Sequence, residues 1–188
     1  MSTREKLLQQ ATRLFAQKGF DGAATEEIVR AARVTKRMLY HYFASKEGLY
    51  RAVLEAQWQR LGGAFSELGE GDLVMRIVDR SFDYVAANPE LVRLAMWEGL
   101  RGGKTSRSLW PTTRGPLFAR AAALLEARAP SLDGRQLLIS LLGALSFYFA
   151  FAPTLGDALG IEPLSDKALA ARKAHLHRLL EPLLSGAS

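Results

Sequence analysis

Apolar residues recur at helical spacing along most of the chain, and no run of residues alternates as a β-strand does. From Leu7 to Phe15 the apolar positions fall at i, i+4, i+7 and i+8, which places them on one face of a helix. Ser2 followed by Glu5 is typical of a capping box, and Gly19 is typical of a helix end. The first segment is therefore predicted to be a helix that ends near residue 19.

The rest of the sequence predicts more helices with short connections. Thr25 and Thr35 stand where each would cap a short helix. A longer helix is expected from Ser45 to about Gly62 or Leu68. The later helices are predicted to begin near residues 72 and 89, to cover about 117–128, to run from 133 to 153, and to span about 166–184. The expected fold class is therefore all-α.

Residues 136–156 carry no charge, so a membrane span has to be considered. Pro153 limits the uninterrupted helix to about 17 residues, or about 25 Å, against about 30 Å of hydrocarbon core. We expect a helix buried on all sides and no membrane span, and in a short chain such burial indicates a partner subunit. The N-terminal residues lack the apolar segment of a secretory signal, so a cytoplasmic location is expected.

The positive charge is concentrated at the N-terminal end. The chain has a net charge of +6, and residues 1–51 hold ten Lys and Arg against five Asp and Glu. Residues 52–188 hold fifteen against fourteen. This division indicates a small head that binds a polyanion, joined to a nearly neutral body, although charge alone would also suit a membrane surface.

Several classes of chemistry find no support in the sequence. The chain has no cysteine and three histidines, which excludes disulfide scaffolds, thiol catalysis and cysteine-ligated zinc. No nucleophile elbow, dinucleotide fingerprint or zinc motif is present. We therefore expect neither an enzyme nor a bound cofactor or metal.

The two short helices have the dimensions of a helix-turn-helix over about residues 24–43. Lys36, Arg37, Tyr40 and His41 fall at i, i+1, i+4 and i+5 and share the face opposite the apolar positions. Two cations, a tyrosine and a histidine on an exposed helix suit the major groove of DNA. The alternative is that these residues form only a solvated face of a helical bundle.

An ordered string of residues also resembles a known family. The string comprises Leu14-Phe15-x4-Phe20, Thr25-x2-Ile28-x2-Ala31-Ala32, Val34-Thr35-x3-Leu39-Tyr40-x-Tyr42-Phe43 and Ser45-Lys46-Glu47-x-Leu49. It is similar to the N-terminal domain of TetR-family transcriptional regulators. The resemblance implies an all-helical homodimer with a three-helix DNA-binding head in residues 1–55, and a helical ligand-binding and dimerisation body in residues 56–188.

The resemblance also implies roles for single residues. Thr25 and Lys46 would hold phosphates, Lys36, Arg37 and His41 would face the bases, and the tyrosines would divide between phosphate contact and packing. The full DNA-binding set is then Thr25, Thr35, Lys36, Arg37, Tyr40, His41, Tyr42 and Lys46.

Two positions depart from the family pattern. Arg33 stands where the family usually has glycine, because the turn favours a left-handed backbone. Either Arg33 carries about 1 kcal/mol of strain or the turn differs. Arg37 stands where many members have a small residue, which adds a potential base contact.

Beyond residue 55 the resemblance is weak, and the body is rich in aromatic residues. Few polar residues accompany them, which would suit an apolar or aromatic small molecule. The candidate pocket residues are Trp58, Phe65, Phe82, Trp97, Trp110, Phe118, Phe147 and Phe151. Residues 99–125 contain five basic residues and no acid, and they form either a surface loop or a basic lid over an anionic group of the ligand.

The function expected from these observations is a ligand-responsive transcriptional regulator. We expect a repressor that binds a palindromic operator in double-stranded DNA as a homodimer and is released by a small apolar or aromatic effector. The dimer would be held by the helices at about 136–152 and 166–184, the second through Leu169, Leu176, Leu180 and Leu183. The alternatives are a protein-interaction adaptor, or a helical small-molecule-binding protein or enzyme whose basic head serves another polyanion.

Overall fold

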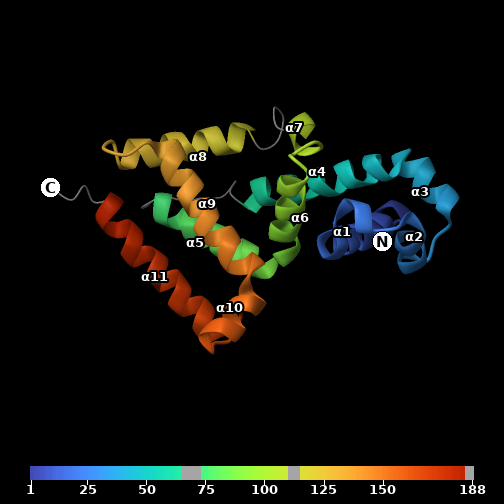
Figure 1. Ribbon diagram of the computed structural model, residues 1–188. Coiled ribbons are helices and arrows are strands. Elements are labelled where there is room, and N and C mark those ends of the chain that lie inside the picture. The colour runs from blue at the N-terminus through green and yellow to red at the C-terminus, as the bar shows by residue number, and fades with distance from the viewer. Residues whose placement is uncertain (65–72, 110–114, 185–188) are drawn as a thin grey trace. The chain divides into compact units, whose positions relative to one another are not determined.

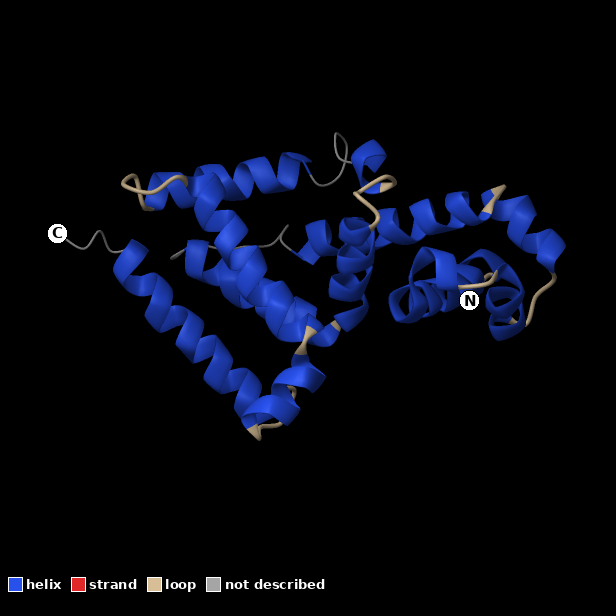
Figure 2. Ribbon diagram, in the orientation of Figure 1, coloured by secondary structure: helices blue, strands red, loops and turns tan. Residues whose placement is uncertain are grey.

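The computed structural model describes residues 1–64, 73–109 and 115–184, and every regular element in those ranges is a helix (Figures 1 and 2). The all-α prediction is thereby confirmed. The elements are α1 (Thr3–Gly22), α2 (Thr25–Ala32), α3 (Lys36–Phe43), α4 (Lys46–Ala64), α5 (Leu73–Ala87), α6 (Pro89–Leu100), α7 (Ser106–Leu109), α8 (Gly115–Arg128), α9 (Gly134–Ala150), α10 (Ala152–Leu159) and α11 (Asp166–Leu184).

The chain divides into two compact units, and each unit takes in two segments of the sequence. The first unit comprises Met1–Leu61 and Glu90–Arg114, and the second comprises Gly62–Pro89 and Gly115–Ser188. Helices α6 and α7 thus fold with the N-terminal helices, although α5 separates them in the sequence. The domain boundary expected near residue 55 stays a prediction.

Helix α1 begins as the sequence predicts, with a complete capping box. The Glu5 amide donates to the Ser2 hydroxyl at 3.2 Å, and the Ser2 amide donates to the Glu5 carboxylate at 2.7 Å. The backbone leaves the helix at Gly19, where φ is 71° and ψ is 179°, and turns helical again as far as Gly22. The expected helix end is therefore a kink, and only glycine adopts this conformation readily.

The core of the first unit is built from the inner faces of its short helices. The largest buried side chains include Leu7, Phe15, Ile28, Leu39 and Tyr50. The Phe15 and Tyr50 rings meet edge to face with their centroids 5.0 Å apart, a favoured aromatic geometry. This packing fixes α2 and α3 on α1 and leaves their outer faces to solvent.

The predicted cap position is wrong for Thr25 in α2, and for Thr35 in α3 the position is right but the side-chain hydrogen bond is absent. Ala24 occupies the N-cap of α2, and Thr25 is the first helical residue. Thr35 does occupy the N-cap of α3, but its side chain accepts no hydrogen bond from the helix. The Thr25 hydroxyl donates to the Glu26 carboxylate at 3.0 Å.

The second unit is a bundle with an aliphatic core. Its buried cluster draws on α5, α8, α9 and α11, and comprises Val74, Val78, Leu125, Ala129, Leu137, Leu180 and Leu184. Asp133 caps α9 by accepting hydrogen bonds from the Arg135 and Gln136 amides. Pro153 lies in the first turn of α10, which the sequence did not predict as a separate helix.

Helix α9 is not buried on all sides within the chain. Leu145 and Phe149 lie on its buried face, whereas Ile139 is 61% exposed and Phe147 is 55% exposed. Within the described residues no single helix is long and apolar enough to cross a membrane. Taken together, α9 and α10 reach that length and apolar character, but the pair is bent by 74°.

The leucines of α11 that the sequence predicts for a dimer contact differ in how deeply they are buried. Leu176 and Leu180 pack into the core of their own unit, which makes them unavailable to a partner. Leu179 and Leu183 are the exposed leucines of this helix. Leu176 and Leu180 of the predicted stripe thus face the chain's own core, whereas Leu183 of the same stripe lies on the outer surface.

Candidate nucleic-acid interface

The turn between α2 and α3 has the left-handed backbone that its position requires. Arg33 has φ 55° and ψ 46°, its amide donates to the Arg30 carbonyl, and the Val34 amide donates to the Val29 carbonyl at 3.0 Å. These hydrogen bonds satisfy two of the carbonyls in the last turn of α2. An arginine therefore adopts the glycine-type conformation, at a cost of about 1 kcal/mol relative to glycine.

Helix α3 is oriented by two buried residues. Leu39 is fully buried and Phe43 is nearly so, and both face the first unit's core. Arg37, Tyr40 and His41 lie on the other side and are exposed. The helix thus presents to solvent the face that the sequence assigns to DNA.

The turn from α3 to α4 depends on a glycine that the sequence analysis did not single out. Ala44 has φ 61°, and the Ser45 hydroxyl accepts a hydrogen bond of 2.9 Å from the Gly48 amide. A β-carbon on Gly48 would lie 2.0 Å from the Phe43 carbonyl oxygen. No other residue fits there without moving α3 relative to α4, so Gly48 holds the exposed helix in place.

The eight expected DNA-binding residues all lie on α2, α3, their flanking turn and the start of α4. Thr35, Lys36, Arg37, Tyr40, His41 and Tyr42 are exposed, and Thr25 and Lys46 are half-buried. His41 and Tyr42 meet edge to face, with their ring centroids 5.1 Å apart.

Two of the three lysine and arginine side chains in this set already have partners. The Lys36 Nζ lies 2.5 Å from a Glu26 carboxylate oxygen. The Lys46 Nζ lies 4.6 Å from the centroid of the Phe20 ring. Arg37 forms no hydrogen bond or ion pair with any residue in the described part of the chain, so its guanidinium is available for another molecule.

Helix α6 packs on the kink of α1, a contact that the sequence did not reveal. A β-carbon on Gly19 would lie 2.9 Å from the Trp97 ring, and the Trp97 indole donates to the Ala16 carbonyl at 3.3 Å. The kink thus leaves room for the indole beside the backbone. Trp97 is therefore a packing residue of the first unit in this structure.

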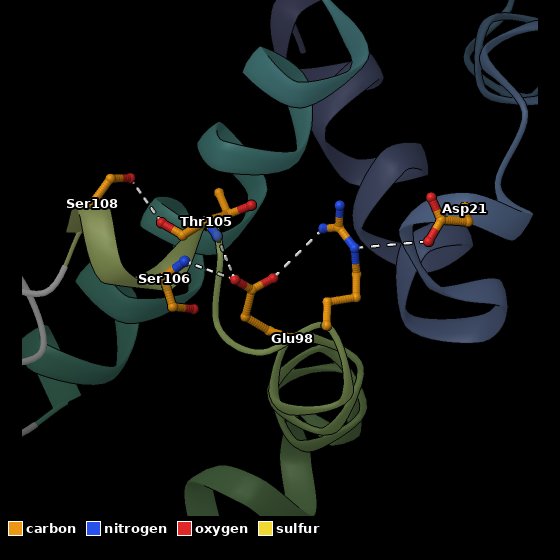
Figure 3. A network of polar contacts seen from close by, with 6 residues as sticks. Asp21, Glu98, Thr105, Ser106 and Ser108 are labelled. Atoms are coloured by element: carbon orange, nitrogen blue, oxygen red, sulfur yellow. Dashed lines mark hydrogen bonds and ion pairs between the residues drawn. The ribbon is translucent and has the colours of Figure 1, made fainter.

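A buried acid next to Trp97 organises the chain that follows α6 (Figure 3). One oxygen of Glu98 accepts hydrogen bonds from the Thr105 and Ser106 amides at 2.6 and 2.8 Å. Arg101 approaches the other oxygen at 3.8 Å, and its guanidinium lies 4.1 Å from the Phe20 ring centroid. Arg101 therefore belongs to this packing, which removes it from the basic lid considered for residues 99–125.

Tyr50 lies in the same part of the first unit. Burial raises the pKa of the Tyr50 hydroxyl well above its usual range, and the nearby negative charge of Glu98 acts in the same direction. The phenol is therefore neutral at any pH that the folded protein meets, and its ring packs against Phe15 and Phe20.

The expected ligand-pocket residues are divided between the two units. Trp58 and Trp97 lie in the first, and Phe82, Phe118, Phe147 and Phe151 lie in the second. Phe147 and Phe151 are exposed and stack with their centroids 4.8 Å apart. Phe65 and Trp110 lie outside the described residues.

The second unit contains a hollow of about 40 Å³ with an almost entirely aliphatic lining. None of the expected aromatic residues lines it. Its wall is formed by Val74, Ile77, Val78, Ser81, Ala121, Leu124, Leu125, Leu138, Leu141, Leu142 and Leu145.

Two family models match the chain, one for each part of the sequence. Residues 7–53 match the model described as bacterial regulatory proteins, tetR family. Residues 72–180, more than half of the chain, match the model of a Tetracyclin repressor-like C-terminal domain.

Similar proteins agree with these matches. The chain is 36% identical over 102 residues to the HTH-type transcriptional repressor SCO4008 of Streptomyces coelicolor. The aligned residues make up 54% of this chain and 52% of that protein. It is 33% identical over 110 residues to the HTH-type transcriptional repressor NicS of Pseudomonas putida, with 56% and 52% covered. The chain thus spans about half the length of these curated relatives.

The fold agrees as well. The crystal structure of the transcriptional regulator SCO4942 from Streptomyces coelicolor superposes with a TM-score of 0.73 at 25% identity, over 95% of this chain and 98% of that one. The sequence resemblance is thereby confirmed, and the expectation that the protein is not an enzyme agrees with a family of regulators. The chain belongs to the tetR family of bacterial regulatory proteins.

Proposed function

We propose that this chain is a transcriptional repressor that binds a palindromic operator as a homodimer and is released by a small apolar or aromatic effector. The observation that carries the proposal is the exposed face of α3, where Arg37, Tyr40 and His41 stand clear of the core. Similarity to SCO4008 and NicS, both HTH-type transcriptional repressors, supports the direction of regulation. A DNA-binding regulator of this kind would act in the cytoplasm, where the genome lies.

Base reading is assigned to Arg37 and His41. They lie one helical turn apart on the exposed face of α3, so both can enter one major groove. Arg37 has no partner among the described residues and can donate two hydrogen bonds to a guanine edge. Lys36 and Tyr40 lie at the edges of this face. We assign the Lys36 ammonium to a backbone phosphate, in place of the base-facing role that the family resemblance implies.

Phosphate contacts are assigned to residues around this face. Thr25 begins α2 and Lys46 begins α4, and the amides at a helix N-terminus favour an anion. Thr35 is the N-cap of α3 and Tyr42 lies in its last turn, and both have hydroxyl groups that can donate to phosphate oxygens.

Dimerisation is assigned to the exposed faces of α9 and α11. Ile139, Gly143, Phe147 and Phe151 recur every four residues along α9 and its end, and all four are exposed. Leu179 and Leu183 show the same spacing on α11. Exposed apolar surface of this extent marks a site of protein association, and a twofold dimer would bring each face against its copy.

The effector is assigned to the second unit, within the body of residues 56–188. The aliphatic hollow between α5, α8 and α9 provides apolar surroundings, and at about 40 Å³ it would have to widen to admit a small molecule. An apolar molecule bound there would act by favouring one of two arrangements of the dimer, typically with about 1–3 kcal/mol of coupling.

The experiment that tests the function is selection of bound duplexes from a random pool by the purified protein. We expect enrichment of a palindrome and a binding constant that falls steeply with salt. Repeating the selection with Arg37 and His41 both changed to alanine should remove the enrichment while binding to random duplex persists. Failure of the wild-type protein to bind any duplex at low salt would overturn the proposal.

A further inference from the structure

The carboxylate of Glu26 holds donor groups of two residues that are expected to bind DNA. One of its oxygens lies 2.5 Å from the Lys36 Nζ, and the other accepts a hydrogen bond of 3.0 Å from the Thr25 hydroxyl. Thr25 is the first residue of α2 and Lys36 is the first residue of α3. One acidic group thus connects the N-terminal ends of both helices of the motif.

The same donors suit a phosphate of the DNA backbone. A phosphate oxygen is anionic and accepts hydrogen bonds from hydroxyl and ammonium groups, as a carboxylate oxygen does. The side chains of Glu26 and Lys36 are 63% and 50% exposed, so a duplex can reach this pair directly. Donors that the carboxylate occupies are unavailable to a phosphate.

We propose that Glu26 is a built-in competitor for DNA phosphate, which occupies the Thr25 hydroxyl and the Lys36 ammonium until a duplex displaces it. The inference rests on the proposed DNA-binding function. Its effect is independent of base sequence, because the contacts that it withholds are phosphate contacts. Glu26 thereby lowers affinity for every duplex, so Arg37 and His41 contribute a larger share of the total binding free energy.

The competitor is charged under all relevant conditions. The hydrogen bond from Lys36 holds the pKa of the Glu26 carboxyl at about 2, well below its usual range. The carboxylate therefore stays ionised at any pH at which the protein would meet DNA, and its competition with phosphate does not depend on pH.

Glu27 provides a matched control within the same helical turn. Its carboxylate oxygens lie 2.6 and 2.8 Å from the Lys18 Nζ, so it too is paired with a lysine. Both acids lie in the first turn of α2 and interact with the same end of the helix dipole. Lys18 belongs to α1 and is outside the expected DNA-binding set. The substitutions Glu26→Gln and Glu27→Gln thus remove equal charge but release different lysines.

The test measures affinity for a random-sequence duplex over a range of salt concentrations, with the full-length protein. Glu26→Gln should bind about fivefold more tightly per subunit and steepen the plot of log affinity against log salt by about one unit per subunit. Glu27→Gln should gain less than about twofold. In a Lys36→Met background, the gain from Glu26→Gln should fall at least threefold. Thermal melting of each variant checks that it is folded.

Two results would overturn the inference. Equal gains for Glu26→Gln and Glu27→Gln would show that only net charge matters. An undiminished gain in the Lys36→Met background would show that Glu26 repels DNA without competing for Lys36. Both results require a wild-type protein that binds duplex, so they are distinct from failure of the proposed function, in which the wild type binds none.

Discussion

The two units of the chain leave different kinds of residue exposed. In the first unit the exposed residues of α3, apart from Met38, are cationic or have side chains that can form hydrogen bonds, with Arg37 and His41 at the centre. In the second unit α9 and α11 expose Ile139, Phe147 and Leu179, which have no hydrogen-bonding side chains.

This difference indicates two kinds of partner. A cationic surface gains affinity for a polyanion by releasing counterions, so its binding weakens as salt rises. An apolar surface gains free energy by leaving water, so its association depends little on salt. The contrast therefore supports DNA as the partner of the first unit and a second copy of the chain as the partner of the second.

The largest effect should come from Gly143→Arg in the apolar face of α9. Nothing lies within 4 Å of a β-carbon at this position, so the monomer should fold normally. A charged side chain between Ile139 and Phe147 should block dimerisation and lower operator affinity by about 100-fold, because two heads no longer bind together. Sedimentation at micromolar concentration measures the oligomeric state.

Gly99→Arg is the matched control for this change. Gly99 is also a helical glycine with nothing within 4 Å of its β-carbon, but it belongs to the first unit. The Gly99→Arg substitution should leave the oligomeric state unchanged. A wild-type protein that sediments as a monomer would contradict the assignment of the apolar face.

Gly19→Ala should destabilise the interior of the first unit. The added β-carbon would lie 2.9 Å from the Trp97 ring at a residue with φ of 71°. Overpacking and the unfavourable backbone together should lower the free energy of unfolding by about 2–3 kcal/mol, as measured in urea. Gly22→Ala, in the same helix at a residue without positive φ, should cost much less. Equal losses would show that Trp97 does not depend on the kink.

Arg37→Ala should weaken binding to the operator by about 1–3 kcal/mol and to random duplex by much less. The reason is that a base contact contributes only where its base is present. Arg37→Lys keeps the charge and loses the paired donors, so it should retain affinity for random duplex. Equal losses on both duplexes for Arg37→Ala would move base reading away from this residue.

Lys46→Ala should have the smallest effect and no sequence preference. Removing one phosphate contact should weaken operator and random duplex similarly and flatten the salt dependence by about one unit per subunit. A loss confined to the operator would instead show that Lys46 acts on base reading, through its contact with Phe20 or directly.

Local pattern was sufficient to predict most of the helices. The capping box at Ser2 and the span of the last helix are confirmed, because both follow from residues a few positions apart. The left-handed backbone at Arg33 agrees with what the family pattern implies. Thr25 does not cap α2 because Ala24 occupies the N-cap position and Thr25 is itself the first helical residue.

The contacts that the sequence did not predict join different elements or loops, from 7 to 81 positions apart in the chain. Trp97 donates to the Ala16 carbonyl across 81 positions, and no periodicity links the two. Composition alone consequently places Trp97 in a ligand pocket. In the sequence, Glu98 is likewise only a polar residue near the end of a helix. In the fold it is buried, and it accepts hydrogen bonds from two backbone amides. The Glu26–Lys36 pair depends on how α2 and α3 cross, which follows from tertiary packing.

The division of the first unit between Met1–Leu61 and Glu90–Arg114 has a consequence for synthesis. As the chain leaves the ribosome, α1 to α3 emerge and can pack on each other early. The contacts of Trp97, Glu98 and Arg101 form only after the intervening segment has also emerged, and its ends must then be brought together at an entropic cost. Newly made N-terminal helices therefore spend several seconds without α6, at the usual rate of about 5–20 residues per second.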